Sequence, residues 1–215
     1  MKSLLILGCG GHGMVVAETA RLMKAWDKIC FLDNKFPEVT ESNHIPVLAA
    51  PDAIEQFDPL QWDIIVAIGD NEIRLKLTQN YINLGFHCPT IIHPQAVVSS
   101  SVSMGAGTVV FANAVINACA EIGRAAIINT SAVVEHECRL GDGVHISPNA
   151  TLAGNVHIGD LSWIGAAAVV INNIVIGSRV MVGAGAVVIR TIGSKDRVVG
   201  SPAKSIYKTE EVDNV

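Results

Sequence analysis

The sequence lacks several features that would direct it to a membrane, to secretion or to nucleic acid. No apolar run is long enough to cross a bilayer. The opening aliphatic stretch breaks at Gly8, too early for the core of a signal peptide. Lys and Arg, 15 residues in all, form no cluster, and the net charge is -5 at pH 7. We therefore expect a cytoplasmic protein that does not insert into membranes and does not bind nucleic acid.

Cysteine is sparse and irregularly spaced. The chain holds five cysteines, an odd number, and none forms a Cys-x-x-Cys pair. This pattern favours reduced thiols over a disulfide framework. Hydrophobic residues are plentiful by contrast, at 50% of 215 residues, which is ample for a buried core in one large or two modest domains.

The strongest positive feature is a repeat of six residues in the second half of the chain. A large hydrophobic residue returns at every sixth position from Ile92 to Val188, without a miss. A second slot four residues further on holds small or β-branched residues, such as Ala114 and Thr108. This period is typical of a parallel β-helix, in which three hexads close one triangular coil and both slots point inward. The seventeen hexads predict nearly six coils.

The first part of the chain alternates strand and helix patterns, which predicts a small βαβ-type parallel sheet. We expect strands at 2–7, 29–32, 64–68 and 89–92, and helices at 14–23 and 72–84. The predicted division of the chain is a Rossmann-like domain at 1–90, a β-helix domain at 91–205 and a loose tail at 206–215.

A glycine-rich turn, GCGGHG at 8–13, follows the first predicted strand and opens the first helix. Its glycines, Gly10 and Gly11 among them, let the backbone approach a ligand, and the helix N-terminus offers N–H groups to a phosphate. Fewer than 90 residues supply about one mononucleotide-binding half, which favours a nucleotide diphosphate sugar over NAD. A tight turn without a ligand is the alternative.

Polar residues after the next strands suit the same crevice. Asp33 and Asn34 could hydrogen-bond ribose or sugar hydroxyls, and Gly69 could line the site. Asn71 fits the N-cap of the helix that follows.

The whole chain resembles the left-handed β-helix sugar acetyltransferases of bacteria, in particular the UDP-4-amino-sugar N-acetyltransferases of the UDP-N-acetylbacillosamine pathway and the related sialic acid O-acetyltransferases. The matching stretches are GCGGHG at 8–13, FLDN at 31–34, AIGDNEIR at 67–74, NTS at 129–131, EHEC at 135–138 and VGSPAK at 199–204. The left-handed sense of the β-helix is taken from this resemblance, because the general rule for connections between parallel strands favours a right-handed coil. The resemblance further implies a homotrimer with active sites between adjacent β-helices, acetyl-CoA as co-substrate, no metal, and a UDP-amino-sugar held by the N-terminal domain. It also suggests that His12 contacts the sugar nucleotide; the alternative is that His12 only caps the glycine turn.

Acetyl transfer to an amine requires a base, and an imidazole that titrates near neutrality suits this role. His136 lies at a hexad corner and should project outward. The resemblance assigns the base to His136 and the supporting carboxylate to Glu137, although Glu135 of a neighbouring chain could also orient the ring. Gly154 lies one coil beyond His136, where a missing side chain would leave room for the thioester and the N–H could support the oxyanion.

Three outward columns follow from the same spacing. One reads Val109, Ile127, His145, Trp163, Met181; another Val115, Val133, Thr151, Val169, Val187; the third Glu121, Arg139, His157, Val175. Two of these faces are apolar, and three-fold packing would bury both. The resemblance maps the coenzyme contacts onto His145, Gly154, Ala166 and Ala184. Cys138 occupies an inward small slot, which favours a buried hydrophobe over a covalent acetyl carrier.

The function that we predict is therefore acetyl-CoA-dependent N-acetylation of the 4-amino group of a UDP-linked amino-deoxy sugar by direct transfer. O-acetylation of sialic acid or a related sugar is the first alternative, because oxygen and nitrogen nucleophiles both need a base. Less favoured are a zinc lyase of the trimeric carbonic anhydrase kind, whose histidine spacing differs from that found here, and a non-enzymatic nucleotide-binding scaffold. The acceptor sugar and the downstream glycan stay open.

Overall fold

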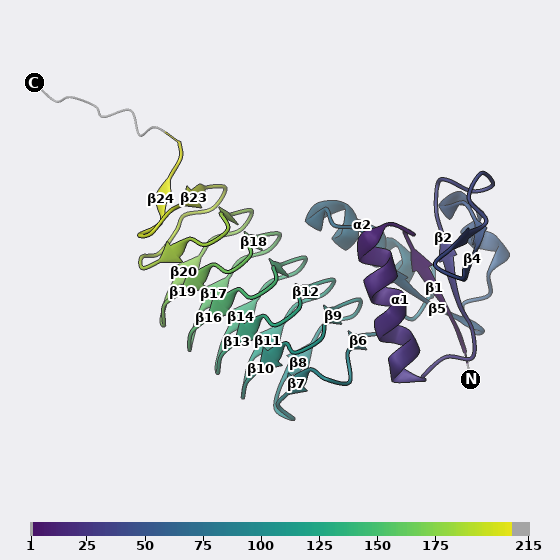
Figure 1. Ribbon diagram of the computed structural model, residues 1–215, viewed down its shortest axis with the longest axis horizontal. Coiled ribbons are helices and arrows are strands. Elements are labelled where there is room, and N and C mark those ends of the chain that lie inside the picture. The colour runs from purple at the N-terminus through teal and green to yellow at the C-terminus, as the bar shows by residue number, and fades with distance from the viewer. Residues whose placement is uncertain (1, 208–215) are drawn as a thin grey trace, which may run out of the picture.

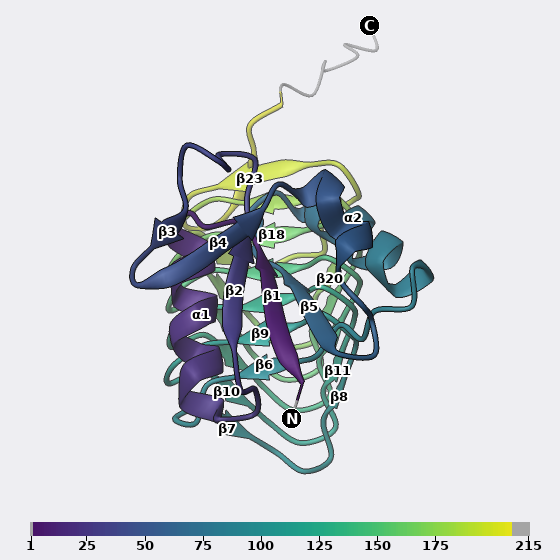
Figure 2. The same ribbon diagram turned by 90° about the vertical axis from the view of Figure 1, so that its right-hand side faces the viewer.

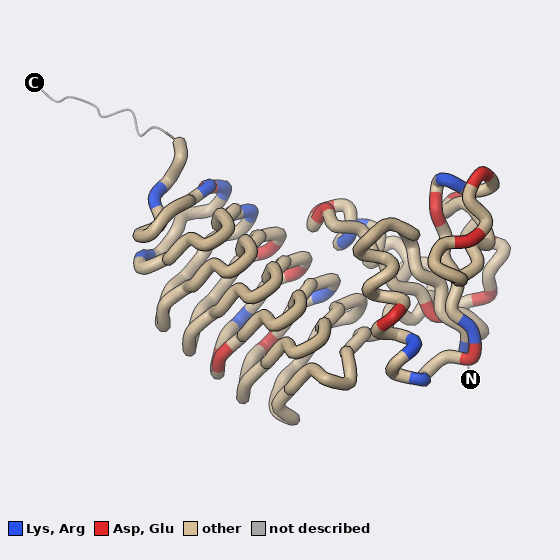
Figure 3. Tube along the Cα trace, viewed as in Figure 1, with Lys and Arg blue, Asp and Glu red and all other residues tan. Residues whose placement is uncertain are grey.

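The computed structural model describes residues 2–207 of the chain, in which a sheet with helices packs against one side of a solenoid (Figure 1). The tail predicted at 206–215 falls mostly outside the described residues. No helix within 2–207 is long and apolar enough to cross a membrane. Charged residues are scattered along the chain and sparse on the solenoid strands (Figure 3).

The N-terminal part is a five-stranded sheet with strand order β3-β4-β2-β1-β5 (Figure 2). Its elements are β1 (Ser3–Leu7), α1 (Gly11–Met23), β2 (Ile29–Leu32), β3 (Glu41–Ser42), β4 (Ile45–Ala49), the 3-10 helix η1 (Pro51–Gln56), β5 (Trp62–Val66) and α2 (Asn71–Asn83). β1 pairs in parallel with both β2 and β5. Its residues Leu4, Leu5 and Ile6 are fully buried, as expected for a central parallel strand covered on both faces.

The structure differs from the sequence-based expectation at two places in this sheet. β3 and β4 were not predicted, because β3 has only two residues and Pro46 interrupts the strand pattern of β4. α2 begins at Asn71, and its N-cap is Asp70 rather than Asn71: the Asp70 carboxylate accepts a hydrogen bond of 2.9 Å from the Ile73 N–H. Asn71, as the first helical residue, keeps its side chain free for other contacts.

From Ile91 to Val188 the solenoid is a left-handed parallel β-helix of two-residue strands that recur every six residues, and the longer β23 (Arg197–Val199) and the antiparallel β24 (Lys204–Ser205) end it. Its strands form three sheets, which we name the valine face, the polar face and the His145 face. The valine face contains β7 (Val97–Val98), β10 (Val115–Ile116), β13 (Val133–Val134), β16 (Thr151–Leu152), β19 (Val169–Val170) and β22 (Val187–Val188). The polar face contains β8 (Ser103–Met104), β11 (Glu121–Ile122), β14 (Arg139–Leu140), β17 (His157–Ile158) and β20 (Val175–Ile176). The His145 face contains β6 (Ile91–Ile92), β9 (Val109–Val110), β12 (Ile127–Ile128), β15 (His145–Ile146), β18 (Trp163–Ile164), β21 (Met181–Val182), β23 (Arg197–Val199) and β24 (Lys204–Ser205).

Each solenoid strand sends one side chain inward and one outward, so the predicted slots form the core. Ile128 and Val134 in the large slot and Ala132 in the small slot are fully buried. Two hydroxyls in the small slot are also buried, and both are hydrogen-bonded: Thr108 Oγ1 donates to the Gly123 carbonyl at 2.8 Å and Ser162 Oγ to the Gly177 carbonyl at 2.7 Å. Pairing of these hydroxyls avoids the cost of burying an unsatisfied polar group.

The N-terminal domain covers the first coils of the His145 face. Val109 and Ile127, which point outward, are only 1% exposed, because they form one core cluster with Val16 and Ala17 of α1. The apolar column that the sequence indicated as a subunit interface is thus partly occupied by the chain's own domain. Only the later coils, from His145 onward, leave this face open.

Candidate active site

The glycine turn between β1 and α1 combines close packing with an open surface. A Cβ on Gly13 would lie 1.9 Å from the Gly8 carbonyl oxygen, so only glycine lets α1 start this close to β1. At Gly10 and Gly11 an added Cβ would meet nothing within 4 Å. Gly10 caps the helix without a side-chain hydrogen bond, so the first N–H groups of α1 can bind an anionic ligand.

Asp33 shapes this turn. One of its carboxylate oxygens accepts a hydrogen bond of 2.8 Å from the Cys9 N–H, and the other accepts one of 2.9 Å from the Lys35 N–H. The carboxylate therefore ties the end of β2 to the glycine turn. Asn34 is exposed beside it. The contacts of Asp33 and Asn34 with a sugar nucleotide remain predictions.

A cavity of about 270 Å³ lies between the glycine turn and the solenoid. It is lined by Gly11, His12, Val15, Gly69, Phe111, Ile127, Asn129, Thr130 and His145. The structure therefore brings together candidates from three separate segments of the sequence. His12 packs edge-on against Phe111, with ring centroids 5.6 Å apart, and its Nε2 atom is buried without a hydrogen-bond partner. Such an atom needs a ligand or a water to satisfy it.

The hydrogen bonds around Asn129 fix the tautomer of His145. Asn129 Oδ1 accepts a hydrogen bond of 2.8 Å from the Thr130 N–H, so the Nδ2 end of the amide faces the imidazole. Nδ2 lies 3.2 Å from His145 Nε2 and can only donate. His145 Nε2 is therefore the acceptor, and the proton of the neutral ring is on Nδ1.

Both imidazoles at this cavity are held in the neutral form. Burial, followed by the positive charge of Arg74 and then His12, lowers the pKa of His145 to about 3. Burial and then Arg74 lower the pKa of His12 to about 4. These groups are set up as uncharged hydrogen-bonding partners near neutral pH.

A mainly apolar groove of about 430 Å³ continues along the His145 face. His145 stacks on Trp163, with ring centroids 5.7 Å apart and planes inclined by 4°. The indole N–H donates to Ser147 Oγ at 2.6 Å. Ala166 and Ala184 line the same groove, so three of the four residues predicted to contact the coenzyme lie together.

His136 and Glu137 form a pair at an exposed corner between β13 and β14. His136 Nδ1 lies 3.0 Å from Glu137 Oε2. A carboxylate accepts only, so Nδ1 carries the proton and the Nε2 lone pair is free to act as a base. Glu137 has φ 59, in the left-handed region, which a glutamate adopts at some cost in conformational free energy.

Gly154 makes room for the His136 ring. A Cβ on Gly154 would lie 2.6 Å from both Cε1 and Nε2 of His136. The space that we expected to hold the thioester is thus filled by the imidazole itself. Gly154 is also outside the groove that contains Ala166 and Ala184, and its contact with the coenzyme remains a prediction.

The His136–Glu137 pair and the His12–His145 cavity lie at different corners of the prism. Asn129 and Thr130 follow β12, whereas His136 follows β13, so strand β13 and the width of the valine face separate the two corners. Neither His136 nor Glu137 lines the cavity or the groove. Within the described part of one chain, the predicted base and the predicted sugar site are not adjacent.

Cys138 is buried in the small slot, with Sγ 3.3 Å from the Ala153 carbonyl oxygen. Burial, the largest influence, raises the pKa of its thiol. Among residues 2–207, no group of three or more His, Cys, Asp or Glu side chains is arranged to hold a metal ion.

Sequence reasoning missed the roles of Asn129, Trp163 and Arg74. The motif NTS contained Asn129, and the 18-residue column placed Trp163 above His145, which β15–β18 pairing confirms. Arg74 stands in the matching stretch at 67–74, but nothing in the helical pattern around it indicated that its side chain is only 1% exposed.

Known proteins match both parts of the chain. Residues 3–81 match the family of the PglD N-terminal domain. UDP-N-acetylbacillosamine N-acetyltransferase of Bacillus subtilis (strain 168) is 39% identical over 111 residues, which is half of this chain and half of that relative.

Solved structures match over nearly the whole length. The acetyltransferase domain of PglB from Neisseria gonorrhoeae FA1090, in complex with acetyl coenzyme A, has a TM-score of 0.93 and 42% identity over 95% of this chain and 99% of that one. A variant of GDP-perosamine N-acetyl transferase from Caulobacter crescentus, in complex with CoA and GDP-perosamine, has a TM-score of 0.91 and 37% identity over 97% of this chain and 98% of that one.

Proposed function

The chain belongs to the family of left-handed β-helix sugar acetyltransferases, and we propose that it transfers the acetyl group of acetyl-CoA to the 4-amino group of a UDP-linked amino-deoxy sugar. The relatives that support this proposal act on, or are bound to, nucleotide-linked amino sugars or acetyl coenzyme A. We further propose a cytoplasmic location, where UDP-sugars and acetyl-CoA are both available.

The observation that carries the proposal is the His136–Glu137 pair. In the proposed step, the sugar amine attacks the thioester carbonyl carbon while His136 Nε2 takes a proton from the amine nitrogen. The C–S bond then breaks, and the coenzyme leaves as a thiol after the proton returns from the imidazole. Glu137 Oε2, 3.0 Å from Nδ1, stabilises the imidazolium that forms between these two events.

The glycine turn and the adjoining cavity support the sugar-nucleotide site. The N-terminus of α1 would face the diphosphate, and the partnerless Nε2 of His12 would hydrogen-bond the sugar in the cavity. The apolar groove along Trp163, Ala166 and Ala184 would hold the pantetheine arm. His145, whose single proton is on Nδ1, would supply a donor where cavity and groove meet.

The separation of the base from the sugar site supports a homotrimer whose sites are shared between chains. His136 of one chain would approach the His12–His145 cavity of its neighbour. Apolar side chains available for this packing include Val97 at 64% exposure, Val169 at 38% and Trp163 at 42%. Exposed apolar faces of this kind mark interfaces, and three-fold closure buries both.

The first experiment is a thiol-release assay with acetyl-CoA and a panel of acceptors. The panel contains a UDP-4-amino-4,6-dideoxy sugar, a GDP-4-amino sugar and free sialic acid. We expect turnover with the UDP-linked amine and a loss of about 10²–10⁴-fold in His136→Ala. His157→Ala, an exchange on the polar face, is the matched control and should keep its rate. Turnover with sialic acid alone would indicate O-acetylation, and no release with any acceptor would favour a binding scaffold.

Subunit mixing tests the shared site. His136→Ala and His12→Ala are each expected to be inactive, yet co-refolded mixed trimers should recover about a quarter of the normal rate, because a site then draws its base and its cavity from different chains. If each site lay within one chain, mixing would restore nothing.

A further inference from the structure

α2 lies beside the solenoid (Figure 1), and its side chains contact successive coils at one corner. This corner, which we name the docking column, consists of residues 18 apart: Gly107, Ala125, Gly143, Leu161 and Arg179. Near its C-terminal end, α2 places Thr78 against Gly107, where a Cβ would lie 2.7 Å from Thr78 Cγ2. At the N-terminal end, Glu72 forms two hydrogen bonds with Arg179, at 2.8 and 2.9 Å.

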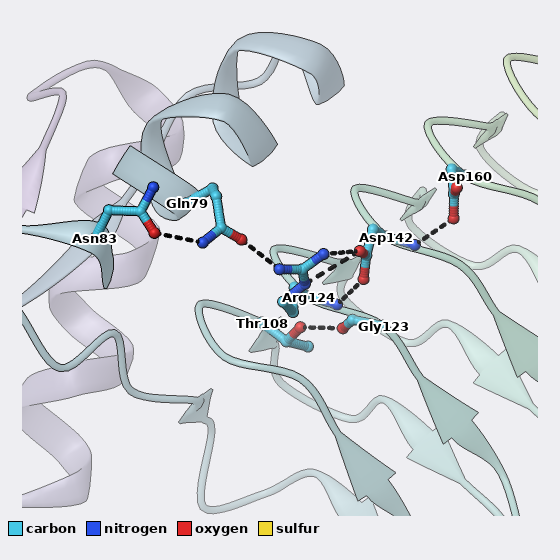
Figure 4. A network of polar contacts seen from close by, with 7 residues as sticks. All are labelled: Gln79, Asn83, Thr108, Gly123, Arg124, Asp142 and Asp160. Carbon is cyan, nitrogen blue, oxygen red and sulfur yellow. Dashed lines mark hydrogen bonds and ion pairs between the residues drawn. The ribbon is translucent and has the colours of Figure 1, made fainter. Parts of the chain in front are cut away.

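Exposed polar groups reinforce this contact along its outer side. Gln79 of α2 accepts a hydrogen bond from Arg124, and Arg124 in turn binds Asp142 of the next coil at 2.6 Å (Figure 4). The Asp142 N–H donates to Asp160 one coil further on. Solvent-exposed pairs of this kind contribute little stability each.

A single buried cation, Arg74, lies at the centre of the contact between α2 and the solenoid and is 1% exposed. On the domain side, Nη1 donates to the carbonyls of Ile68 and Gly69, both at 3.0 Å, and Nη2 donates to Asn71 Oδ1 at 2.8 Å. Ile68 and Gly69 form the turn that follows β5, and Gly69 lines the sugar cavity.

On the solenoid side, the same guanidinium binds two coils. Nε donates to the Ala125 carbonyl at 2.8 Å, and Nη2 donates to the Gly143 carbonyl at 3.0 Å. All five N–H donors of Arg74 are therefore used, and every acceptor is a neutral oxygen. Burial lowers the pKa of Arg74 to about 10, so the charge persists at neutral pH.

The coils of a solenoid resemble one another, so a specific contact is needed to set which coil the N-terminal domain binds. Each coil presents a similar carbonyl at the docking column, and a slip by one coil would shift the domain by about 4.8 Å. The column permits the close approach of Arg74 only where its residues are small. A Cβ on Gly143 would already lie 3.2 Å from the Asn71 carbonyl oxygen and 3.4 Å from Leu75 Cβ, and the next coils present Leu161 and Arg179.

We propose that Arg74 is a positioning residue for the sugar-nucleotide site: its buried guanidinium joins the Gly69 turn to the coils of Ala125 and Gly143 and so fixes which coil faces the glycine turn. This proposal rests on the proposed function. With this register, His12 faces Asn129 and His145 across the cavity. The charge of Arg74 also lowers the pKa of both His12 and His145, after burial, which supports a direct influence on the same site.

The test compares three variants with the unsubstituted protein. Arg74→Lys keeps the charge but loses the planar fork that reaches four carbonyls. Asn71→Ala removes one acceptor of Arg74 and the bonds of 3.2 and 3.4 Å to the Leu161 and Ser162 carbonyls, without touching the guanidinium. Glu72→Gln is the matched control, because it weakens an exposed contact on the same helix and the same column.

We expect Arg74→Lys to raise KM for the UDP-amino sugar about tenfold or more, which is the size of effect that the loss of one interaction gives. KM for acetyl-CoA should stay within about twofold, because Arg74 positions only the sugar-nucleotide site. Asn71→Ala should change the same constant by about threefold, and Glu72→Gln by less than about twofold. An unchanged KM for the sugar nucleotide in a folded Arg74→Lys protein would overturn the proposal. So would an equal rise of both constants, which a merely structural role predicts.

Histidine titration by NMR in the ligand-free protein provides a readout independent of turnover. In the unsubstituted protein, His12 and His145 should remain neutral at pH 5. In Arg74→Met, loss of the charge and of the register should move both titrations upward, whereas Glu72→Gln should leave them in place. Unmoved titrations in a folded Arg74→Met protein would contradict the register role. No turnover by the unsubstituted protein would reject the proposed function and the sugar-nucleotide part of this proposal, and the titration would still decide the register.

Discussion

The corner that carries His136 and the cavity that holds His12 and His145 place the same side chain in opposite surroundings. The side chain of His136 is 57% exposed and has a carboxylate 3.0 Å from Nδ1. His12 and His145 line a cavity between the two domains, and burial and the positive charge of Arg74 lower their pKa values. A carboxylate beside Nδ1 fixes which ring nitrogen carries the proton, whereas burial beside a cation lowers the pKa of an imidazole and keeps the ring neutral.

If His136 is the base, as we propose, then its environment and not its residue type sets it apart from His12 and His145. The two places also differ in which parts of the fold build them. The repeat alone builds the His136 corner, since β13, β14 and Gly154 all belong to the solenoid. The cavity exists only because the N-terminal domain is docked on the His145 face.

Crowding the exposed corner should give the largest effect. In Gly154→Val the new Cβ would fall 2.6 Å from His136 Nε2 and Cε1, so the ring must leave its position. We expect at least about a hundredfold loss of acetyl transfer, because the base is displaced. Asn172→Val, one coil further along the same column and exposed, is the control. Light scattering should give both variants the same molar mass as the unsubstituted protein, and full activity in Gly154→Val would rule out the observed ring position as the active one.

Removing the carboxylate should have the next largest effect. In Glu137→Ala the His136 ring loses the acceptor that fixes its tautomer, and we expect a loss of about 10–100-fold. Glu137→Gln should lose less, because an amide oxygen can still accept from Nδ1. Glu135→Ala separates the two carboxylates: Glu135 contacts the His136 backbone N–H at 3.4 Å and not the ring. A greater loss in Glu135→Ala than in Glu137→Ala would transfer the orienting role to Glu135.

The buried histidines should make stability depend on pH. The pKa values of His12 and His145 are lowered to about 4 and about 3, whereas an unfolded histidine titrates near 6.5. Between about pH 6.5 and pH 4 the unfolded chain therefore binds protons that the folded chain does not, and the free energy of unfolding falls as the pH falls. This stabilisation is complete above about pH 6.5. For each histidine that stays neutral in the folded chain, the free energy of unfolding changes by up to about 1.4 kcal/mol per pH unit within this window.

We expect His145→Gln to flatten the decline in melting temperature between pH 7 and pH 4.5, because glutamine does not titrate. His157→Gln, on the polar face, should leave the decline unchanged. Equal slopes in His145→Gln and the unsubstituted protein would show that His145 is not held neutral by the fold.

The solenoid was largely predictable from the sequence, because every inward position of the repeat must hold a hydrophobic or small side chain. Ile128 and Val134 are buried where the six-residue period places them, and the 18-residue register brings His145 next to Trp163. The corner position of His136 follows from the same period. The left hand required a resemblance, since period alone does not specify it.

The junction was not predictable, because it arises from contacts between segments far apart in the sequence. Arg74 reaches Ala125 and Gly143, and no local pattern distinguishes it from an exposed arginine on a helix. The tautomer of His145 likewise depends on Asn129, whose own orientation is set by a backbone N–H. Strand β4 escaped detection because its Pro46 interrupts the local strand pattern, and its pairing with β2 on one side and β3 on the other is set by tertiary contacts.

The smallest expected effect concerns Cys138, the residue next to the His136–Glu137 pair. A covalent mechanism would need a thiolate that reaches the thioester. Cys138 instead points into the core, is fully buried, and has a thiol whose pKa is raised by burial. Cys138→Ala should therefore change the rate of acetyl transfer by less than about twofold and lower stability by about 1 kcal/mol, the cost of a small cavity. Rapid mixing should show no burst of coenzyme A release before the sugar is added. A burst in the unsubstituted protein that disappears in Cys138→Ala would mean that the inward slot opens during turnover, and the contrast between the exposed corner and the buried cavity would then no longer account for the chemistry.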